Sequence, residues 1–386
     1  MALNLPEGVD TPVFVLDLKR LRRNLETAAR VREAAGCQIL LATKAFALPA
    51  AFPLMRDYLD GTTASGEYEA RLGAECFGKA VHAYAPAFTD AEMGRLLDFA
   101  GHVYLNSAEQ LARFGPRVRA AGAKVGLRVN PGYSHATLGG DLYDPCAPGS
   151  RFGEVADRLG DVDWSGVDIF HVHALCESRH EGSVGLIDHV ATHFADQIAK
   201  VETVNFGGGH FLNAPDYDVD ALISAIRAFR ERFGVEVVLE PGSGLVVNTG
   251  ELYATVLALH RNQVDLAILD ASASTHMPDV LEVPYRPGID GAGEPGEHPH
   301  TYTLGGKTCM TGDVIGTYSF PEPLQVGQRL RFADQMHYSF VKTNTFNGTP
   351  LPNLAMRHED GSVELLSQFG YEAFRERLGW PAGMRP

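Results

Sequence analysis

The chain of 386 residues has few cysteines and no long apolar run, and each shortage excludes a class of protein. No apolar segment approaches the roughly 20 residues that a membrane-spanning helix needs. Residues 1–8 carry no basic segment followed by an apolar one, so we expect a cytoplasmic protein without a membrane partner. The cysteines are odd in number and show no paired spacing, which argues against a disulfide framework: Cys37, Cys76, Cys146, Cys176 and Cys309.

Positively charged residues are also fewer than negatively charged ones. The chain has 33 Lys and Arg against 48 Asp and Glu, a formal net charge of −15. Such an excess argues against nucleic acid as a partner and suits a cationic small molecule. A hydrophobic fraction of 45% with 21% charged residues is typical of a globular protein, with one large core or two ordinary ones.

Short β-type runs alternate with helical patterns from residue 38 to residue 240, which indicates βαβ units and a parallel sheet. We expect helices between most of these runs, at residues 49–59, 66–77, 91–100 and 183–200. Eight runs in about two hundred residues predict an α/β fold, a (β/α)₈ barrel of the TIM type rather than an open doubly wound sheet. The predicted strands are residues 39–44, 61–65, 80–85, 102–106, 124–130, 167–173, 201–206 and 235–240.

The pattern changes after Gly242, where strands follow one another without helices of comparable length. Residues 12–17 form a further extended run that precedes the first helix, at 18–35, and has no obvious place in the barrel. We therefore expect a barrel of residues 18–246 and a β-rich domain, a β-barrel or sandwich, of residues 1–17 and 247–386. Its predicted strands include residues 251–259, 263–270, 328–332 and 337–342.

Two predicted strands end in motifs that point to one ligand. The first ends in Gly207, Gly208 and Gly209, and the second ends at Glu240, followed by Pro241 and Gly242. Successive glycines leave backbone N–H groups free to approach a phosphate closely, and barrels commonly hold phosphate after strands seven and eight. The alternative is a flexible turn. An acidic residue on the next strand favours a ligand that has phosphate at one end.

Lys44 closes an apolar strand at the same face of the predicted barrel. Such a lysine is often only a solvated strand end, but apolar neighbours would lower its pKa and make it a nucleophile for a Schiff base. Lys44, the glycines 207–209 and Glu240 together suggest pyridoxal phosphate, because they offer an amine for the aldehyde, a cradle for the phosphate and a carboxylate for the ring nitrogen. That carboxylate keeps the nitrogen protonated and strengthens the ring as an electron sink, which favours decarboxylation.

Two further motifs leave alternatives open. His171 and His173 alternate with apolar residues, so His173 stacks on a cofactor ring, is a hydrogen-bonded core residue, or binds zinc with neighbouring Cys176 and His180. No second pair completes a tetrahedral zinc set, so we expect no metal. Cys309 lies between glycine-rich turns, as a reactive thiol or as a passive thiol in a hairpin, and the sequence around it lacks the spacing of a phosphate-binding P-loop.

These motifs resemble those of the fold-type III pyridoxal-phosphate decarboxylases, the group that includes alanine racemase and the ornithine and diaminopimelate decarboxylases. Within the group they are most similar to the carboxynorspermidine (carboxyspermidine) decarboxylase family. The likeness covers nearly the whole chain, and its last two segments are the most specific. It is carried by residues 11–17, 42–46, 59–65, 173–177, 276–287 and 341–348.

The resemblance implies a homodimeric enzyme that uses pyridoxal 5'-phosphate to convert carboxynorspermidine or carboxyspermidine to norspermidine or spermidine and CO₂. It implies that Lys44 binds the cofactor covalently and that His173 stacks on its ring. Gly207, Gly208 and Gly209 would bind the phosphate, with a further contact from Tyr338. Glu240 would meet the pyridine nitrogen.

The resemblance also implies that Cys309 completes the active site of the partner subunit and returns a proton to the α-carbon. Asp313, His276 and Ser243 would belong to the substrate pocket. Ser243 departs from the family, since ornithine and diaminopimelate decarboxylases carry arginine there, and its loss argues against diaminopimelate with its distal carboxylate. Met310 likewise replaces an acid of the ornithine enzymes.

Three alternatives follow from the same residues. One is a decarboxylase of another basic amino acid, diaminopimelate or ornithine. Another is an amino-acid racemase, although Glu240 at the ring nitrogen favours a stronger electron sink than racemases of this fold use. The third is a non-catalytic cofactor-binding protein, which would not need the β-rich domain with Cys309.

Overall fold

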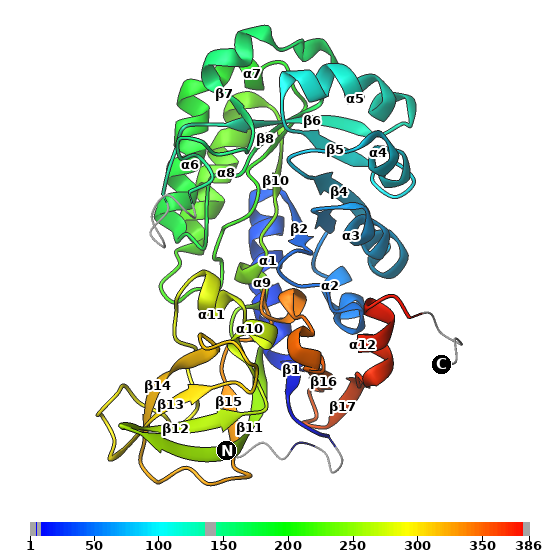
Figure 1. Ribbon diagram of the computed structural model, residues 1–386. Helices are drawn as coiled ribbons and strands as arrows, with labels where there is room; N and C mark the ends of the chain where they lie inside the picture. The colour runs from blue at the N-terminus through cyan, green and yellow to red at the C-terminus, as the bar shows by residue number, and fades with distance from the viewer. Residues whose placement is uncertain (1–4, 6–8, 136–143, 381–386) are drawn as a thin grey trace. The chain divides into compact units, whose positions relative to one another are not determined.

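The computed structural model describes residues 5, 9–135 and 144–380. The chain divides into two compact units, one of residues Arg22–Leu245 and one that combines Met1–Leu21 with Val246–Pro386 (Figure 1). The second unit is therefore discontinuous in sequence. Among the described residues, no helix is both long and apolar enough to cross a membrane.

The unit Arg22–Leu245 contains a closed ring of eight parallel strands. Each strand pairs with the next in the order β2, β3, β4, β5, β6, β8, β9, β10, and β10 pairs with β2 to close the ring. This confirms the predicted (β/α)₈ barrel. The strands are β2 (Gln38–Ala42), β3 (Gly61–Ala64), β4 (Ala80–Tyr84), β5 (His102–Leu105), β6 (Lys124–Asn130), β8 (Ile169–Val172), β9 (Thr203–Asn205) and β10 (Glu236–Leu239), with β7 (Glu154–Val155) paired to β6 outside the ring.

Helices connect these strands, and Figure 1 shows α3, α4 and α5 on the outer side of the sheet. Local sequence sets their ends: the side chain of Asp218 caps α8 by accepting from the N–H of Ala221, and Gly234 ends it with a φ of 68°. The helices are α1 (Leu18–Ala35), α2 (Phe52–Arg56), α3 (Glu67–Leu72), α4 (Asp90–Leu96), α5 (Ala108–Ala120), α6 (His180–His193), α7 (Ala195–Ile198), α8 (Val219–Phe233) and α9 (Ser243–Val246).

The single helix predicted at residues 183–200 is wrong. Phe194, with a φ of −125° and a ψ of 21°, breaks it into α6 and α7. Within α6 itself, Leu186 and Val190 are buried, whereas His193, the last residue of that helix, is exposed.

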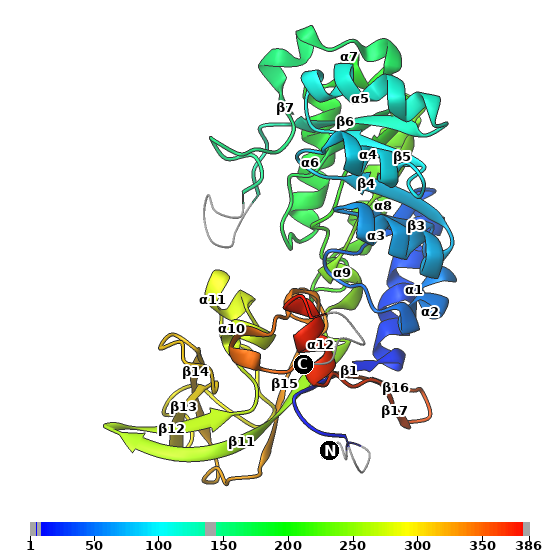
Figure 2. The same cartoon turned by 45° about the vertical axis from the view of Figure 1, so that its right-hand side comes forward.

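The second unit is built on a mixed eight-stranded sheet, which confirms the predicted β-rich domain. Its order is β14, β13, β12, β11, β1, β16, β17, with β15 on β11, and Figure 2 shows β11 and β12 side by side as a long ribbon. The strands are β1 (Val13–Asp17), β11 (Gly250–Asn262), β12 (Val264–Leu269), β13 (His300–Gly305), β14 (Val314–Phe320), β15 (Arg329–Phe332), β16 (Asn353–Arg357) and β17 (Val363–Ser367). The helices are α10 (Ala273–His276), α11 (Asp279–Glu282) and α12 (Tyr371–Arg377).

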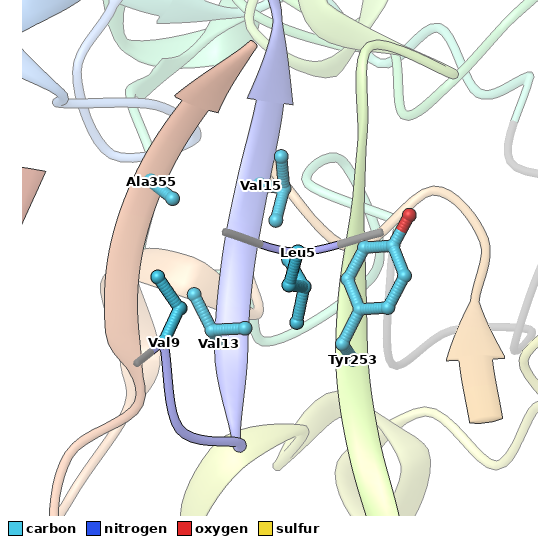
Figure 3. Close-up of a cluster of buried hydrophobic side chains, with 6 residues drawn as sticks. All are labelled: Leu5, Val9, Val13, Val15, Tyr253 and Ala355. Atoms are coloured by element: carbon cyan, nitrogen blue, oxygen red, sulfur yellow. The ribbon is translucent and has the colours of Figure 1, made fainter. Parts of the chain in front are cut away.

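Strand β1 belongs to this sheet, as expected of the extended run before the first helix. It pairs antiparallel with β11 and parallel with β16. Alternate residues of a strand face the same side, so Val13 and Val15 pack together with Tyr253 of β11 and Ala355 of β16 (Figure 3). The first strand of the chain thus joins two segments that follow the whole barrel in sequence.

The strand predicted at residues 337–342 is wrong. Tyr338 has a φ of 44°, and the chain then forms a 3₁₀ turn over Phe340–Lys342. A left-handed backbone does not continue a strand.

Candidate active site

The structure brings Lys44, His173, the glycines 207–209 and Glu240 together at one end of the barrel. Lys44 follows β2, His173 follows β8, Gly207 follows β9 by one residue and Glu240 follows β10. Since β8, β9, β10 and β2 are successive neighbours in the ring, these residues extend from adjoining strand ends. The carboxyl ends of the strands are where barrels of this kind carry their sites.

The glycine segment is a close-packed cradle and not a loose turn. Gly207 and Gly209 have φ values of 65° and 88°, in the region that favours glycine. A Cβ on Gly209 would lie 2.2 Å from the carbonyl oxygen of Leu175, and one on Gly208 would lie 2.6 Å from that of Glu240. The segment therefore needs glycines for both its conformation and its approach to the neighbouring strand ends.

Two of the three glycine N–H groups have partners within the barrel. Gly207 donates to Oδ1 of Asn205 at 2.7 Å, and Gly208 donates to Nδ1 of His173 at 3.1 Å. The expectation that successive N–H groups are all free is therefore wrong for these two, which hold the shape of the cradle. Gly209 has no hydrogen-bond partner for its N–H in the described part of the chain, so this group is available to an anion.

His173 is held as a neutral ring beside the cradle. Its Nδ1 accepts from Gly208, so the ring proton of the neutral form lies on Nε2. Burial lowers its pKa well below the usual range, and the charges of Lys44 and Arg128 act in the same direction. A neutral imidazole whose orientation is fixed suits stacking on a ligand ring.

Arg128 is a site residue that sequence reasoning missed. It lies on β6, is buried, and donates to the carbonyl oxygen of His173 at 3.0 Å. Its guanidinium packs over the rings of Tyr84 and Phe152. An arginine inside an otherwise apolar strand is the sequence feature that could have pointed to it.

Lys44 has the properties of an amine nucleophile. Its side chain is exposed, yet the protein atoms around it exclude enough water to lower its pKa, and the positive charge of Arg128 lowers it further. The negative charges of Glu240 and Glu69 oppose this shift. A lowered pKa enlarges the fraction of neutral amine, which is the form that attacks an aldehyde.

Glu240 is a buried carboxylate, 4% exposed, at the other side of the cradle. Its Oε1 accepts from Nδ2 of Asn205 at 2.8 Å, and its Oε2 lies 3.7 Å from Nε2 of His171. Burial raises its pKa, which hydrogen bonds from Asn205 and Thr63 oppose. Both ring nitrogens of His171 are buried without a partner among the described residues, so polar groups at this end of the site remain for a ligand.

The same side chains provide a donor set for a metal. Atoms of His171, His173 and Glu240 all lie within 4.8 Å of one another, close enough to surround one ion. Nδ1 of His173 already accepts from Gly208, which leaves only Nε2 as a ligand on that ring. Cys176 and His180, which the zinc alternative included, are not in this group.

Ser243 and His210 are buried in the same unit. Ser243 is the first residue of α9, directly after Gly242. His210 follows the cradle, and its Nδ1 lies 2.9 Å from Oγ of Ser183. This contact attaches the end of the cradle to α6.

In the β-sheet unit, Asp313 organises the loop that carries Cys309. Its buried carboxylate accepts from Oγ of Ser272 at 2.9 Å and from Oγ1 of Thr308 at 2.6 Å. The backbone N–H groups of Ser274 and Thr308 add contacts of 3.3 Å. Both carboxylate oxygens are thus engaged within the loop region.

Cys309 and Tyr338 are placed differently from Asp313. Cys309 is exposed, has a free thiol, and its N–H donates to Oδ1 of Asn347 at 2.7 Å. Tyr338 lies in the turn after β15, in the left-handed conformation that non-glycine residues rarely adopt. Both were predicted to belong to the site, and the thiol of Cys309 is exposed and free.

His276 is fully buried, and both of its ring nitrogens are engaged. Nδ1 accepts from the N–H of Ser272 at 3.2 Å, so Nε2 carries the proton and donates to the carbonyl oxygen of Pro350 at 3.0 Å. Burial lowers its pKa to about 4. Through Ser272 it supports Asp313.

We expect the protein to lose stability between pH 6.5 and pH 4. Burial lowers the pKa of both His210 and His276 from 6.5 to about 4. In this window the unfolded chain binds protons that the folded chain does not, so stability is complete above pH 6.5 and falls as the pH decreases, by about 3 kcal/mol for each histidine. The free energy of unfolding, measured by urea denaturation at several pH values, tests this.

Two variants make the test specific. His276→Gln should make the slope of unfolding free energy against pH shallower by about one proton. His193→Gln, at the exposed end of α6, should leave the slope unchanged. A wild-type stability that is flat from pH 7 to pH 4.5 would show that these histidines are not buried as neutral groups.

The fold and the chemistry of the strand ends define the class, a pyridoxal-phosphate enzyme of the barrel type. The family described as pyridoxal-dependent decarboxylase, C-terminal sheet domain, matches residues 13–335, and the chain belongs to this family. It is accordingly a decarboxylase that uses pyridoxal phosphate. The glycine cradle and the partnerless nitrogens of His171 fit such a ligand.

Named relatives extend over almost the whole chain. Carboxyaminopropylagmatine decarboxylase of Synechocystis sp. is 41% identical over 374 residues, 96% of each chain. Carboxynorspermidine/carboxyspermidine decarboxylase of Campylobacter jejuni is 35% identical over 382 residues, 96% of this chain and 99% of that one. The crystal structure of carboxynorspermidine decarboxylase from C. jejuni, complexed with norspermidine, has a TM-score of 0.88 at 34% identity and covers 96% of this chain and 100% of that chain.

Proposed function

We propose that the chain decarboxylates carboxynorspermidine or carboxyspermidine to norspermidine or spermidine and CO₂, a step of polyamine biosynthesis. The observation that carries this proposal is the full-length likeness to an enzyme solved with norspermidine. The acidic charge of the chain, −15, suits a polycationic product. The position of Lys44, His173, the glycine cradle and Glu240 at adjoining strand ends supports it as well.

The cofactor, when bound, supplies an electron sink for the electron pair that remains on the α-carbon after CO₂ leaves. Lys44 would provide the amine that attaches it, and the neutral ring of His173 would pack on its ring. The cradle of glycines 207–209, in which Gly209 offers its N–H, would hold the phosphate, with a further contact from Tyr338. The carboxylate of Glu240 would keep a proton on the ring nitrogen.

Residues of the β-sheet unit complete the proposed site. We assign to Cys309 the return of a proton to the α-carbon, in the active site of the partner subunit of a homodimer. Ser243, Asp313 and His276 remain our candidates for the substrate pocket. The hydrogen bonds of Asp313 and His276 favour a role in shaping the loop around Cys309.

Free thiols at all five cysteines fit a cytoplasmic location.

A second substrate is favoured by one specific observation. The Synechocystis relative, at 41% identity, is named for carboxyaminopropylagmatine. That compound shares the reacting α-amino acid end and differs at the distal end, where it carries a guanidinium group. The two proposals therefore share the chemistry at Lys44 and Glu240 and differ in what recognises the distal cation.

CO₂ release by the purified holoenzyme separates these substrates. We expect kcat/KM for a carboxylated polyamine to exceed that for diaminopimelate and ornithine by ~10²-fold or more, because a pocket that pairs with distal amines leaves its groups unpaired with shorter substrates. A preference for carboxyaminopropylagmatine over carboxynorspermidine and carboxyspermidine would select the second proposal. A preference for diaminopimelate or ornithine would overturn both. A cofactor-loaded protein that releases CO₂ from none of the five would be a binding protein.

A further inference from the structure

Buried polar side chains continue from Glu240 into the interior of the barrel. Asn205 on β9, Tyr104 on β5 and His82 on β4 are exposed by 0%, 0% and 1%. Asn205 contacts Glu240, Tyr104 contacts Asn205 at 2.7 Å, and His82 contacts Tyr104 at 2.5 Å. The proposed function assigns no role to Tyr104 or His82.

The donors and acceptors that each group possesses fix the direction of every hydrogen bond in the series from Glu240 to His82. The backbone N–H of Gly207 can only donate, so the amide atom that it meets at 2.7 Å is Oδ1 of Asn205. Nδ2 must then donate one hydrogen to Glu240 and the other to Oη of Tyr104. Since Oη accepts from Asn205, its single hydrogen is directed to Nδ1 of His82.

His82 is the last member of this series of hydrogen bonds, and its ring is a neutral acceptor there. Its ring is stacked on that of His102, with centroids 3.9 Å apart and planes 10° from parallel. Burial lowers its pKa well below the usual range, and the neighbouring His102 lowers it further. Burial likewise raises the pKa of Tyr104 well above its usual range, so the phenol keeps its proton for His82.

The amide in the middle determines what this chain can do. An amide donates and accepts but does not pass a proton on at neutral pH. This series of hydrogen bonds therefore does not conduct protons to Glu240. Asn205 instead uses both of its hydrogens and its oxygen at once, on Tyr104, Glu240 and Gly207. One amide thus joins the two ends of the proposed cofactor site, the carboxylate for the ring nitrogen and the first glycine of the phosphate cradle.

We propose that Tyr104 is a positioning residue for the cofactor, which acts by holding Asn205 in the one orientation that serves both Glu240 and the glycine cradle. The inference rests on the proposed assignment of Glu240 and the glycines 207–209 to the cofactor. Without the phenol oxygen, one hydrogen of Asn205 is buried and unpaired, and the amide turns or shifts to satisfy it. Glu240 and the glycine cradle then lose their alignment together.

Release of pyridoxal phosphate from the holoenzyme tests this. Tyr104→Phe should release the cofactor about tenfold faster than wild type, the effect of one lost buried hydrogen bond. Tyr318→Phe is the matched control, because Oη of Tyr318 also makes a buried hydrogen bond, to the carbonyl oxygen of Pro287, in the β-sheet unit. It should lower the melting temperature similarly and leave the release rate unchanged.

A spectroscopic readout separates positioning from general destabilisation. With cofactor labelled by ¹⁵N in the ring, the nitrogen resonance of Tyr104→Phe should move toward the unprotonated position, because Glu240 is no longer held against it. The resonance in Tyr318→Phe should match that of wild type. Wild-type release and a wild-type resonance in Tyr104→Phe would overturn the proposal.

A second variant covers the case in which Tyr104→Phe does not fold. Asn205→Asp has the same shape and still accepts from Gly207, but it places a carboxylate oxygen where the donor to Glu240 stood. We expect release at least as fast as in Tyr104→Phe, and wild-type release would overturn the proposal. A wild-type holoenzyme that binds the cofactor but decarboxylates no polyamine would refute the proposed function and leave this inference standing.

Discussion

Replacement of Lys44 by alanine will abolish CO₂ release, with a loss of roughly 10⁴-fold or more, as for other residues that act as covalent nucleophiles. The lowered pKa of Lys44 provides a neutral amine at the end of β2, and alanine offers no substitute for it. The variant should also lose the absorption band of bound cofactor after desalting. The CO₂ assay and the absorption spectrum of the same preparation measure the two effects.

The control for Lys44 is an exposed lysine elsewhere on the barrel unit. Lys200→Ala changes the charge equally and should keep both turnover and absorption. Borohydride reduction of the holoenzyme should leave the cofactor attached to the peptide that contains Lys44. Attachment to another lysine, or more than a tenth of wild-type turnover in Lys44→Ala, would contradict the assignment of this amine.

Mixing Lys44→Ala subunits with Cys309→Ala subunits will restore activity that neither variant shows alone. If Cys309 acts in the site of the partner subunit, a mixed dimer contains one site with both residues intact and one site with neither. The isolated mixed dimer has one intact site of two, so its activity should approach about one half of wild type, and the unsorted mixture, in which random assortment makes half of the dimers mixed, about one quarter. The assay is CO₂ release after the two variants are co-expressed with different affinity tags and the mixed dimer is isolated.

The matched control for the mixing experiment combines variants of the same barrel end. Lys44→Ala mixed with Glu240→Ala should recover activity only if each site takes these two residues from different subunits, which we do not expect because both belong to one barrel. Isolated mixed dimers of Lys44→Ala and Cys309→Ala that stay inactive would refute the shared site.

The barrel was predictable because its strands carry their own pattern. Runs such as residues 38–44 and 235–240 are apolar, short and bounded by glycine or polar residues, and a parallel sheet buries both of their faces. The β-sheet unit was less predictable. Strand β13 is only partly buried at most of its positions and β14 shows no alternation of buried and exposed residues, and β16 pairs with β1 from the opposite end of the sequence, so neither periodicity nor local turns identifies them.

Some residues of the candidate site were likewise predictable from the sequence, and others were not. Lys44 and Glu240 were predictable because each places a charge directly after an apolar strand. Tyr104 was not, because its role depends on a contact with Asn205, 101 residues away in sequence. Asp313 was expected to face the substrate, and only the side chains folded around it show that its oxygens are occupied within the loop.

The place of β1 in its sheet has a consequence for the order of events on the ribosome. Asp17 pairs with Arg357, 340 residues later, in both strand register and a side-chain contact of 3.2 Å. At a synthesis rate of roughly 5–20 residues per second, β1 waits on the order of 20 to 70 s for this neighbour. The barrel and β11 are complete well before then, so the nascent chain carries a folded barrel while β1 has β11 as a neighbour on one edge and no partner yet on the edge that β16 will cover. This interval is when a chaperone would have most to protect.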